Sequence, residues 1–172
     1  CRISFQGIEL LAGVVQKVLH CFESAPKKVL VLDCDNTLWG GVVGELGLSG
    51  ITLGSDGLGQ AFSDFQLAAK HLASQGVLLT IASKNNEEDA LEVLRYHPHM
   101  VLKEKHFAAK RINWDDKVSN MKSLALEINL GLDSFVFLDD DQMNQKMIQQ
   151  FLPEVLVVEL PKDPSLFVST LT

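Results

Sequence analysis

The sequence lacks the features that mark two large classes of protein. No apolar run approaches the roughly 18 residues that a membrane-spanning helix requires, and no signal-peptide pattern stands at the N-terminus. The 172 residues carry a formal net charge of −7, whereas a nucleic-acid-binding protein normally presents a basic face. We therefore expect neither a membrane nor a nucleic acid among the partners.

Cysteine is scarce, and its spacing does not indicate disulfide bonds. Cys1, Cys21 and Cys34 form an odd, widely separated set without a C-x-x-C pair. Such a set predicts a reducing compartment and hence a cytoplasmic location. The chain starts at Cys1 instead of Met, as expected for a domain excised from a longer polypeptide or for a chain from which a tag was removed.

The proportions of hydrophobic and charged residues are those of an ordinary globular domain, and strand-like and helix-like patterns of apolar residues alternate along the chain. Hydrophobic residues make up 47% and charged residues 22% of the chain. Apolar runs predict strands at residues 29–32, 77–82, 134–138 and 155–160, and shorter strands at 100–103 and 108–112. Helical spacing predicts helices at residues 7–22, 61–72, 87–96, 115–130 and 142–151. We expect Asn86 to begin the third of these helices, Gly76 to cap the second, and Gly131 to end the fourth.

Alternating strands and helices predict an α/β, Rossmann-like fold, with a parallel sheet covered by helices on both faces. Residues 40–59 interrupt the alternation, because they hold eight of the 12 glycines. We expect a small β-hairpin flap there, above the end of the first strand. The chain then divides into a helical lead-in at residues 1–26, a catalytic domain at 27–162 and a C-terminal tail at 163–172.

Ligands of parallel sheets bind beyond the carboxyl ends of the strands, so the polar residues at these ends are the candidates for function. Asp33 and Asp35 directly follow the first strand. Two carboxylates so close together repel each other, and a divalent metal relieves the repulsion. The alternative is a turn in which Asp35 or Asn36 caps a helix.

Three other strand and helix ends carry candidates. Ser83 ends the second strand beside a helix N-terminus, which favours a phosphate, whereas Asn86 is expected only to cap that helix. Asp139 and Asp140 end a later strand, where adjacent acids suit a metal. Asp141 is expected in a solvated turn. Lys117 opens a helix, where the helix dipole disfavours a cation, so it is either a partner of bound anions or a surface lysine.

This order of motifs, D-x-D-x-T, then Ser, then Lys, then Asp-Asp, resembles the haloacid-dehalogenase superfamily of aspartate-nucleophile phosphatases and phosphotransferases. The resemblance implies that Asp33 is the nucleophile and Asp35 the general acid/base. It implies Mg²⁺ bound by the Asp33 carboxylate, the Asp35 carbonyl and Asp139, supported by Asp140. It also gives Lys117 a role in catalysis, and the residues expected to bind the substrate or its phosphate are Thr37, Ser83, Lys84 and Asn85.

Longer strings resemble the FkbH-like branch of this superfamily: residues 32–45 (LDCDNTLWGGVVGE), 83–90 (SKNNEEDA), 111–117 (RINWDDK) and 132–140 (LDSFVFLDD). The similarity spans roughly residues 27–162. It implies a glyceryl transferase and phosphatase of polyketide assembly lines. Such an enzyme takes a three-carbon unit from 1,3-bisphosphoglycerate, removes its phosphates and loads it on the phosphopantetheine arm of an acyl carrier protein. Asp141-Gln142 stands where the family commonly has Asn-Pro, which leaves open another acyl unit such as lactyl.

Cys34 has two interpretations. A thiol between the catalytic aspartates would attack an acyl phosphate and carry the three-carbon unit as a thioester. Against this, neighbouring carboxylates raise the pKa of a thiol, and free cysteine is often a small buried hydrophobe. A stand-alone magnesium phosphatase and a non-catalytic docking domain of a synthase are the alternatives to acyl transfer. The tryptophans, Trp39 and Trp114, either line the pocket or pack in the core, and core packing is the default expectation for aromatic side chains.

Overall fold

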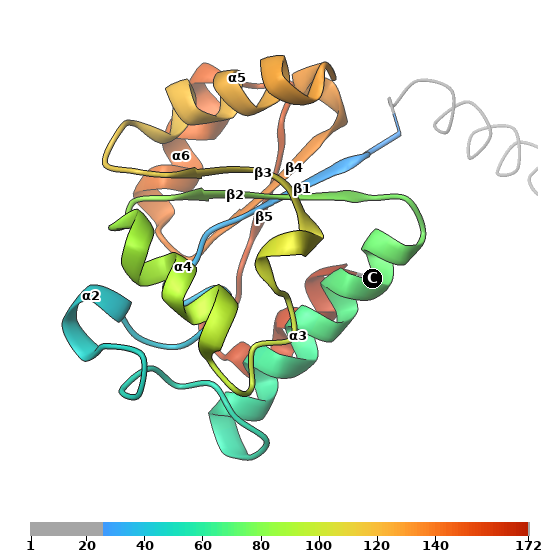
Figure 1. The fold of residues 1–172 in the computed structure, drawn as a ribbon. Helices are drawn as coiled ribbons and strands as arrows, with labels where there is room; N and C mark the ends of the chain where they lie inside the picture. Colours follow the sequence, from blue (N-terminus) through green and yellow to red (C-terminus); the bar gives the residue numbers. More distant parts are fainter. Residues whose placement is uncertain (1–25, 172) are drawn as a thin grey trace, which may run out of the picture.

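The computed structural model describes residues 26–171, which form three layers with a sheet in the middle (Figure 1). The helix expected at residues 7–22 lies outside the described residues. None of the described helices is both long enough and apolar enough to cross a membrane.

The sheet consists of five parallel strands in the order β3-β2-β1-β4-β5. This order confirms the predicted α/β class with a parallel sheet. Leu32, at the end of β1, pairs with Ile81 of β2 and Leu138 of β4, so the carboxyl ends of the central strands lie level. The strands are β1 (Val29–Leu32), β2 (Leu78–Ser83), β3 (Phe107–Ile112), β4 (Phe135–Asp139) and β5 (Leu156–Glu159).

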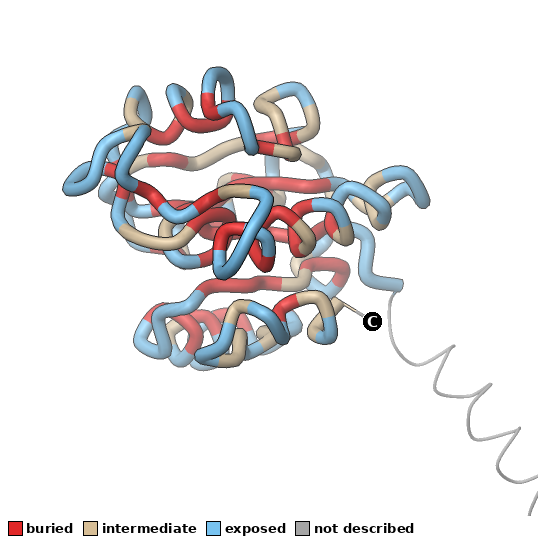
Figure 2. The backbone as a smooth tube through the Cα atoms, turned by 90° about the horizontal axis from the view of Figure 1, so that it is seen from below, coloured by how far each residue is buried: buried red, intermediate tan, exposed pale blue. Residues whose placement is uncertain are grey.

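Both faces of the sheet are covered, which explains why β1 is apolar at every position. Leu30 and Leu32 pack on one side and Val29 and Val31 on the other, and all four are buried. Figure 2 shows the buried backbone in the interior, with exposed segments around it. Parallel strands covered on both faces read as continuous hydrophobic runs. The first face is covered by α3 (Gly57–Ser74), α4 (Glu87–Tyr96) and the 3₁₀ helix η3 (Pro164–Leu171), the second by α5 (Lys117–Ile128) and α6 (Gln142–Phe151) (Figure 1).

Three sequence expectations about local structure are wrong. Residues 40–59 do not form a β-hairpin: one bridge joins Gly40 to Thr52, and between them lies the short helix α2 (Val43–Leu46). The run Met100–Lys103 is not a strand, although Met100 and Leu102 are buried. Helix α5 ends earlier than expected, because Asn129 adopts the left-handed conformation (φ 57°) that was assigned to Gly131.

The C-terminal segment contributes to the core. Phe167 of η3 is buried and makes edge-to-face contacts with Phe62 and Phe65 of α3, at ring-centroid distances of 5.8 and 5.5 Å. Residues 163–172 were expected to be a tail, yet this contact ties them to the catalytic part. The division into a lead-in, a catalytic domain and a tail stays a prediction.

Gln66 of α3 explains why the apolar run 100–103 leaves the sheet. Its side chain is fully buried, and its Oε1 accepts hydrogen bonds from the backbone N–H groups of Val101 and Leu102 (2.9 and 3.0 Å). Its Nε2 donates to the carbonyl of Leu38 (2.6 Å). The Gln66 side chain thus supplies the hydrogen-bond acceptor that a neighbouring strand would give to Val101 and Leu102. It also bonds the start of the flap, at Leu38, to α3.

Replacing this amide by a hydrocarbon is a direct test of the fastening. We expect Gln66→Leu to lower the free energy of unfolding by about 3 kcal/mol, because three buried backbone groups lose their partner. Urea denaturation measures the change. Gln60→Leu is the matched control on the same helix, because Gln60 is exposed and its side chain donates to the side chain of Asp64 in an exposed hydrogen bond, not to a buried backbone group. Equal stability of the two variants would show that Gln66 is not a structural fastener.

Candidate metal-dependent active site

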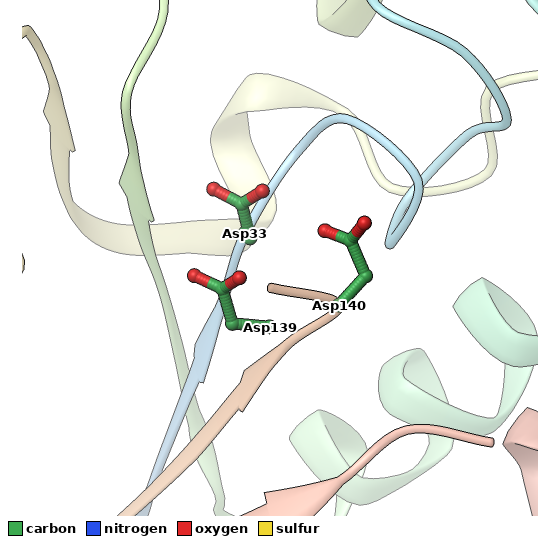
Figure 3. Close-up of side chains that lie close together, drawn as sticks. All are labelled: Asp33, Asp139 and Asp140. Carbon is green, nitrogen blue, oxygen red and sulfur yellow. The ribbon is translucent and has the colours of Figure 1, made fainter. Parts of the chain in front are cut away.

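Three aspartates meet at the carboxyl ends of β1 and β4. Asp33 follows β1 and Asp139 ends β4, and the level register of these neighbouring strands places the two side by side. Together with Asp140 they offer three carboxylate oxygens that lie within 4.8 Å of one another. Figure 3 shows the three carboxylates pointing to the same side of the strand ends. The sequence predicted all three as metal ligands, and the structure brings them together.

Lys117 neutralises the buried part of this cluster. Its Nζ lies 2.6 Å from Asp33 Oδ1 and 2.9 Å from Asp139 Oδ2, and it also donates to the Ala82 carbonyl at 2.5 Å. Only 1% of the Lys117 side chain is exposed, so this first residue of α5 is not a surface lysine. Such a network is stable only as a unit, since each charge is desolvated.

The network sets the protonation of its members. Burial raises the pKa of Asp33 to about 6, an effect that the charge of Lys117 opposes and that of Asp139 adds to. Burial alone would lower the pKa of Lys117, but the two carboxylates together raise it. At neutral pH Asp33 is therefore an anion beside a cation, as a nucleophilic carboxylate requires.

Asp35 is held apart from the three clustered aspartates. Its Oδ1 accepts hydrogen bonds from Trp39 Nε1 (2.8 Å) and the Val43 N–H (3.1 Å), and its Oδ2 accepts one from Asn85 Nδ2 (2.9 Å). Burial raises the pKa of Asp35, although these hydrogen bonds oppose the rise. The carboxylate is thus fixed near the start of the flap, and metal binding by the Asp35 carbonyl stays a prediction.

The residues expected to bind phosphate differ in their surroundings. Ser83 is buried at the end of β2, and a hydrogen bond from it to Asp33 lowers the pKa of that carboxyl. Asn85 uses its amide on Asp35 and on the Asn86 N–H (2.9 Å), so it positions Asp35. Lys84 is exposed and makes no ion pair with the described residues. Phosphate binding by these residues stays a prediction.

Thr37 and Asn36 shape the loop that carries the aspartates. Thr37 is fully buried, and its Oγ1 has no hydrogen-bond partner among the described residues. Asn36 adopts a left-handed conformation (φ 55°), and its Oδ1 accepts a hydrogen bond from the Gly41 N–H at 2.8 Å. Asn86 caps α4 by accepting from the Glu88 N–H, as predicted. The side chain of Asn36 therefore holds the loop in a tight turn.

Two amide residues of α6 belong to the site although sequence reasoning did not identify them. Asn144 Nδ2 donates to both carboxylate oxygens of Asp139 (3.3 and 3.1 Å), and Gln145 Nε2 donates to the Asp139 carbonyl (2.7 Å). Both are buried in a helix that begins three residues after Asp139. The signal was a pair of amides on an otherwise apolar helix face.

The two tryptophans lie in different environments. Trp39 is fully buried, as predicted, and in addition fixes Asp35. Trp114 is 74% exposed, so its assignment to the core is wrong. It lies in the turn between β3 and α5, where the backbone N–H of Asp115 donates to Asn113 Oδ1 (3.0 Å).

Cys34 stands between Asp33 and Asp35 in the sequence, but its surroundings differ from theirs. It is fully buried and belongs to the apolar core on the α3 side of the sheet. Burial and the charge of Asp33 raise the pKa of the thiol far above its ordinary value. A thiol in this position stays protonated, which favours the interpretation of Cys34 as a small buried hydrophobe.

The cluster fits a hard divalent cation. Its donors are all carboxylate oxygens, which suit Mg²⁺, Ca²⁺ or Mn²⁺ better than a soft metal. Asp140 is the most exposed of the three, so the cluster opens to solvent. Partial desolvation of its carboxyl, together with the charge of Asp139, raises the pKa of Asp140. The single ammonium of Lys117 does not balance three carboxylates, and a bound cation would offset the excess negative charge.

Removing the buried cation tests the network. We expect Lys117→Met to lower the free energy of unfolding by about 3–5 kcal/mol, because two buried carboxylates lose their counter-charge. Chemical denaturation in the presence of a metal chelator gives the value. Lys122→Met, at an exposed position of the same helix, should cost far less. If both variants unfolded alike, the ion network would not contribute to stability.

Comparison with known proteins agrees with this architecture. No protein-family model matches the chain, and no curated protein matches it. Among solved structures, the N-terminal part of the protein BF1531 from Bacteroides fragilis, which contains a phosphatase domain and is complexed with Mg, is 40% identical with a TM-score of 0.84. The alignment covers 90% of this chain and 42% of that one, so the chain spans less than half of that structure.

Two more distant structures share the fold. A HAD family enzyme from Bacteroides thetaiotaomicron, in complex with magnesium and inorganic phosphate, is 15% identical (TM-score 0.54), with 79% of this chain and 94% of that chain covered. A HAD-superfamily hydrolase from Geobacter sulfurreducens is 12% identical (TM-score 0.51), with 87% and 100% covered. The chain therefore has the fold of the haloacid-dehalogenase hydrolases.

Proposed function

We propose that the chain is a magnesium-dependent phosphatase that uses Asp33 as its nucleophile. The observation that carries the proposal is the 2.6 Å contact of Asp33 with Lys117, within one cluster with Asp139 and Asp140 at the strand ends. The phosphatase domain of BF1531 with Mg, and the Bacteroides thetaiotaomicron enzyme with magnesium and phosphate, support it. Fold stability alone gives no reason to place three carboxylates together.

The side chains have complementary tasks in such a reaction. Asp33 attacks the substrate phosphorus and forms an aspartyl phosphate, while Asp35 gives a proton to the departing oxygen. Water then hydrolyses the aspartyl phosphate, with Asp35 accepting the proton. Lys117 balances the charge that develops at the phosphoryl group, and a magnesium ion held by the clustered aspartates would reduce the repulsion between two anions. Trp39 and Asn85 hold Asp35 in place throughout.

A general chromogenic phosphate ester tests this function. We expect wild-type protein to release phosphate from p-nitrophenyl phosphate only with Mg²⁺, and Asp33→Asn to lose this activity by roughly 10³-fold or more. Asp139→Asn should weaken Mg²⁺ binding in isothermal titration, a readout that does not depend on turnover. Asp56→Asn is the control, since Asp56 is exposed and its side chain makes no capping hydrogen bond. Full activity of Asp33→Asn would exclude an aspartyl-phosphate route.

We further propose a finer function: the substrate is a phosphorylated three-carbon acyl donor such as 1,3-bisphosphoglycerate, and the acceptor is the phosphopantetheine thiol of an acyl carrier protein. The similarity of residues 32–45, 83–90, 111–117 and 132–140 to the FkbH-like branch supports this proposal. So does the size of the flap, since residues 40–59 add only α2 above the site. A site without a full cap domain suits a macromolecular acceptor.

The burial of Cys34 bears on the route of acyl transfer. A thioester on Cys34 needs a thiolate that reaches the substrate, whereas this thiol is buried in the core with a raised pKa. The carrier thiol can instead attack the acyl phosphate directly. Its sulfur forms the thioester bond, the phosphate leaves from the same carbon, and the thiol proton is released. We favour this direct route.

Intact-protein mass spectrometry distinguishes the two routes. After incubation with 1,3-bisphosphoglycerate and Mg²⁺, we expect no glyceryl adduct on wild-type protein or on Cys34→Ala. With an acyl carrier protein added, both should load it to the same extent, because Cys34 takes no part in the direct route. A wild-type adduct that is missing in Cys34→Ala and that moves onto the carrier protein would establish the thioester route instead.

A further inference from the structure

A cavity of about 410 Å³ lies beside the aspartate cluster, on the side of β5. Asn36 and Asp140 line it where it meets the cluster, and Gln145 and Glu159 line it farther along. Phe62 and other apolar residues form a further part of its lining. Of these residues, the proposed phosphatase chemistry uses only Asp140. The cavity is therefore next to the reacting carboxylates without being explained by them.

Glu159 has a defined position in this cavity. It is the last residue of β5, and it pairs in register with Asp139 on the neighbouring strand β4. Adjacent parallel strands lie about 4.8 Å apart, so Glu159 stands at the same sheet edge, one strand away from the cluster. It does not belong to the three-aspartate cluster, and it makes no ion pair with the described residues. Glu159 is exposed and Lys162 lines the same cavity, so this carboxylate is solvated and available to a ligand.

Gln145 supplies a second hydrogen-bond acceptor to the cavity. The residue is 4% exposed, and its Nε2 is fixed on the Asp139 carbonyl at 2.7 Å. Its Oε1 accepts no hydrogen bond from the described residues, yet the side chain lines the cavity. This oxygen is not among the enclosed, unsatisfied polar atoms of the described residues, so it is open to the cavity and available to a ligand donor.

The apolar part of the lining sets the shape of a suitable ligand. Phe62 and Phe167 pack edge to face, at a ring-centroid distance of 5.8 Å, and both line the cavity. The cavity thus combines fixed hydrogen-bond acceptors with apolar surface. Small-molecule sites typically have this combination, in which the polar groups fix the orientation of the ligand.

We propose that this cavity binds the part of the substrate that carries the phosphate, and that this part is a hydroxylated carbon chain or ring. Its hydroxyl groups donate to the carboxylate of Glu159 and to Oε1 of Gln145, and its carbon face packs on Phe62 and Phe167. The inference rests on the proposed phosphatase function, because it places the phosphate at Asp33. Glu159 is then a specificity residue that takes no part in the chemistry.

Binding titrations separate the inference from turnover. We would titrate Asp33→Asn protein, in which hydrolysis is blocked, with ribose 5-phosphate and with butyl phosphate in the presence of Mg²⁺. We expect ribose 5-phosphate to bind at least about tenfold more tightly, and a second substitution, Glu159→Leu, to reduce that preference about tenfold. Glu159→Gln keeps an acceptor oxygen and should retain more of the preference.

Glu154→Leu is the matched control, because this exposed glutamate lies near the opposite end of β5, away from the cavity. It should leave the ratio of the two dissociation constants unchanged. An equal preference with and without Glu159 would overturn the inference, and so would the absence of measurable ribose 5-phosphate binding. Failure of the phosphatase proposal appears elsewhere, as the absence of Mg²⁺-dependent phosphate release by wild-type protein.

Discussion

The buried contact between Lys117 and two carboxylates is the constraint on which the site depends. Asp33 and Asp139 cannot both be desolvated without a counter-charge, and Lys117 cannot be buried without them. The level register of β1 and β4 brings the carboxylates together, and the first residue of α5 brings the ammonium. The packing of α5 on the sheet and the formation of the ion pairs therefore depend on each other.

Amide side chains fix the positions of the aspartates in addition to the ion pairs. Asn144 and Gln145 hold Asp139 by its carboxylate and its carbonyl, and Asn85 holds Asp35. Amides orient an anion without changing the net charge of the site, which is why they suit a cluster that also has to accept a cation. The carboxylates are thus positioned before any substrate arrives, and this preorganisation is what electrostatic catalysis requires.

The sequence was informative where one physical signal decides, and misleading where two compete. The run at Val29–Leu32 predicted a buried strand because parallel strands covered on both faces need apolar residues throughout. The run at residues 100–103 carries the same signal but is not a strand, because Gln66, 35 residues away from Val101, takes up its backbone N–H groups. Hydrophobicity predicts that a segment is buried, whereas its hydrogen-bond partners decide its conformation.

In the candidate site, too, some features could be predicted from the sequence and others could not. Asp33, Asp139 and Asp140 were predicted from their places at strand ends, and strand ends alone bring them together. The surroundings of Cys34 could not be predicted in this way, because successive side chains leaving a strand face different environments. Asp33 meets Lys117, whereas Cys34 enters the apolar core. The chemistry of Cys34 therefore depends on its burial in the core more than on its place in sequence between two aspartates.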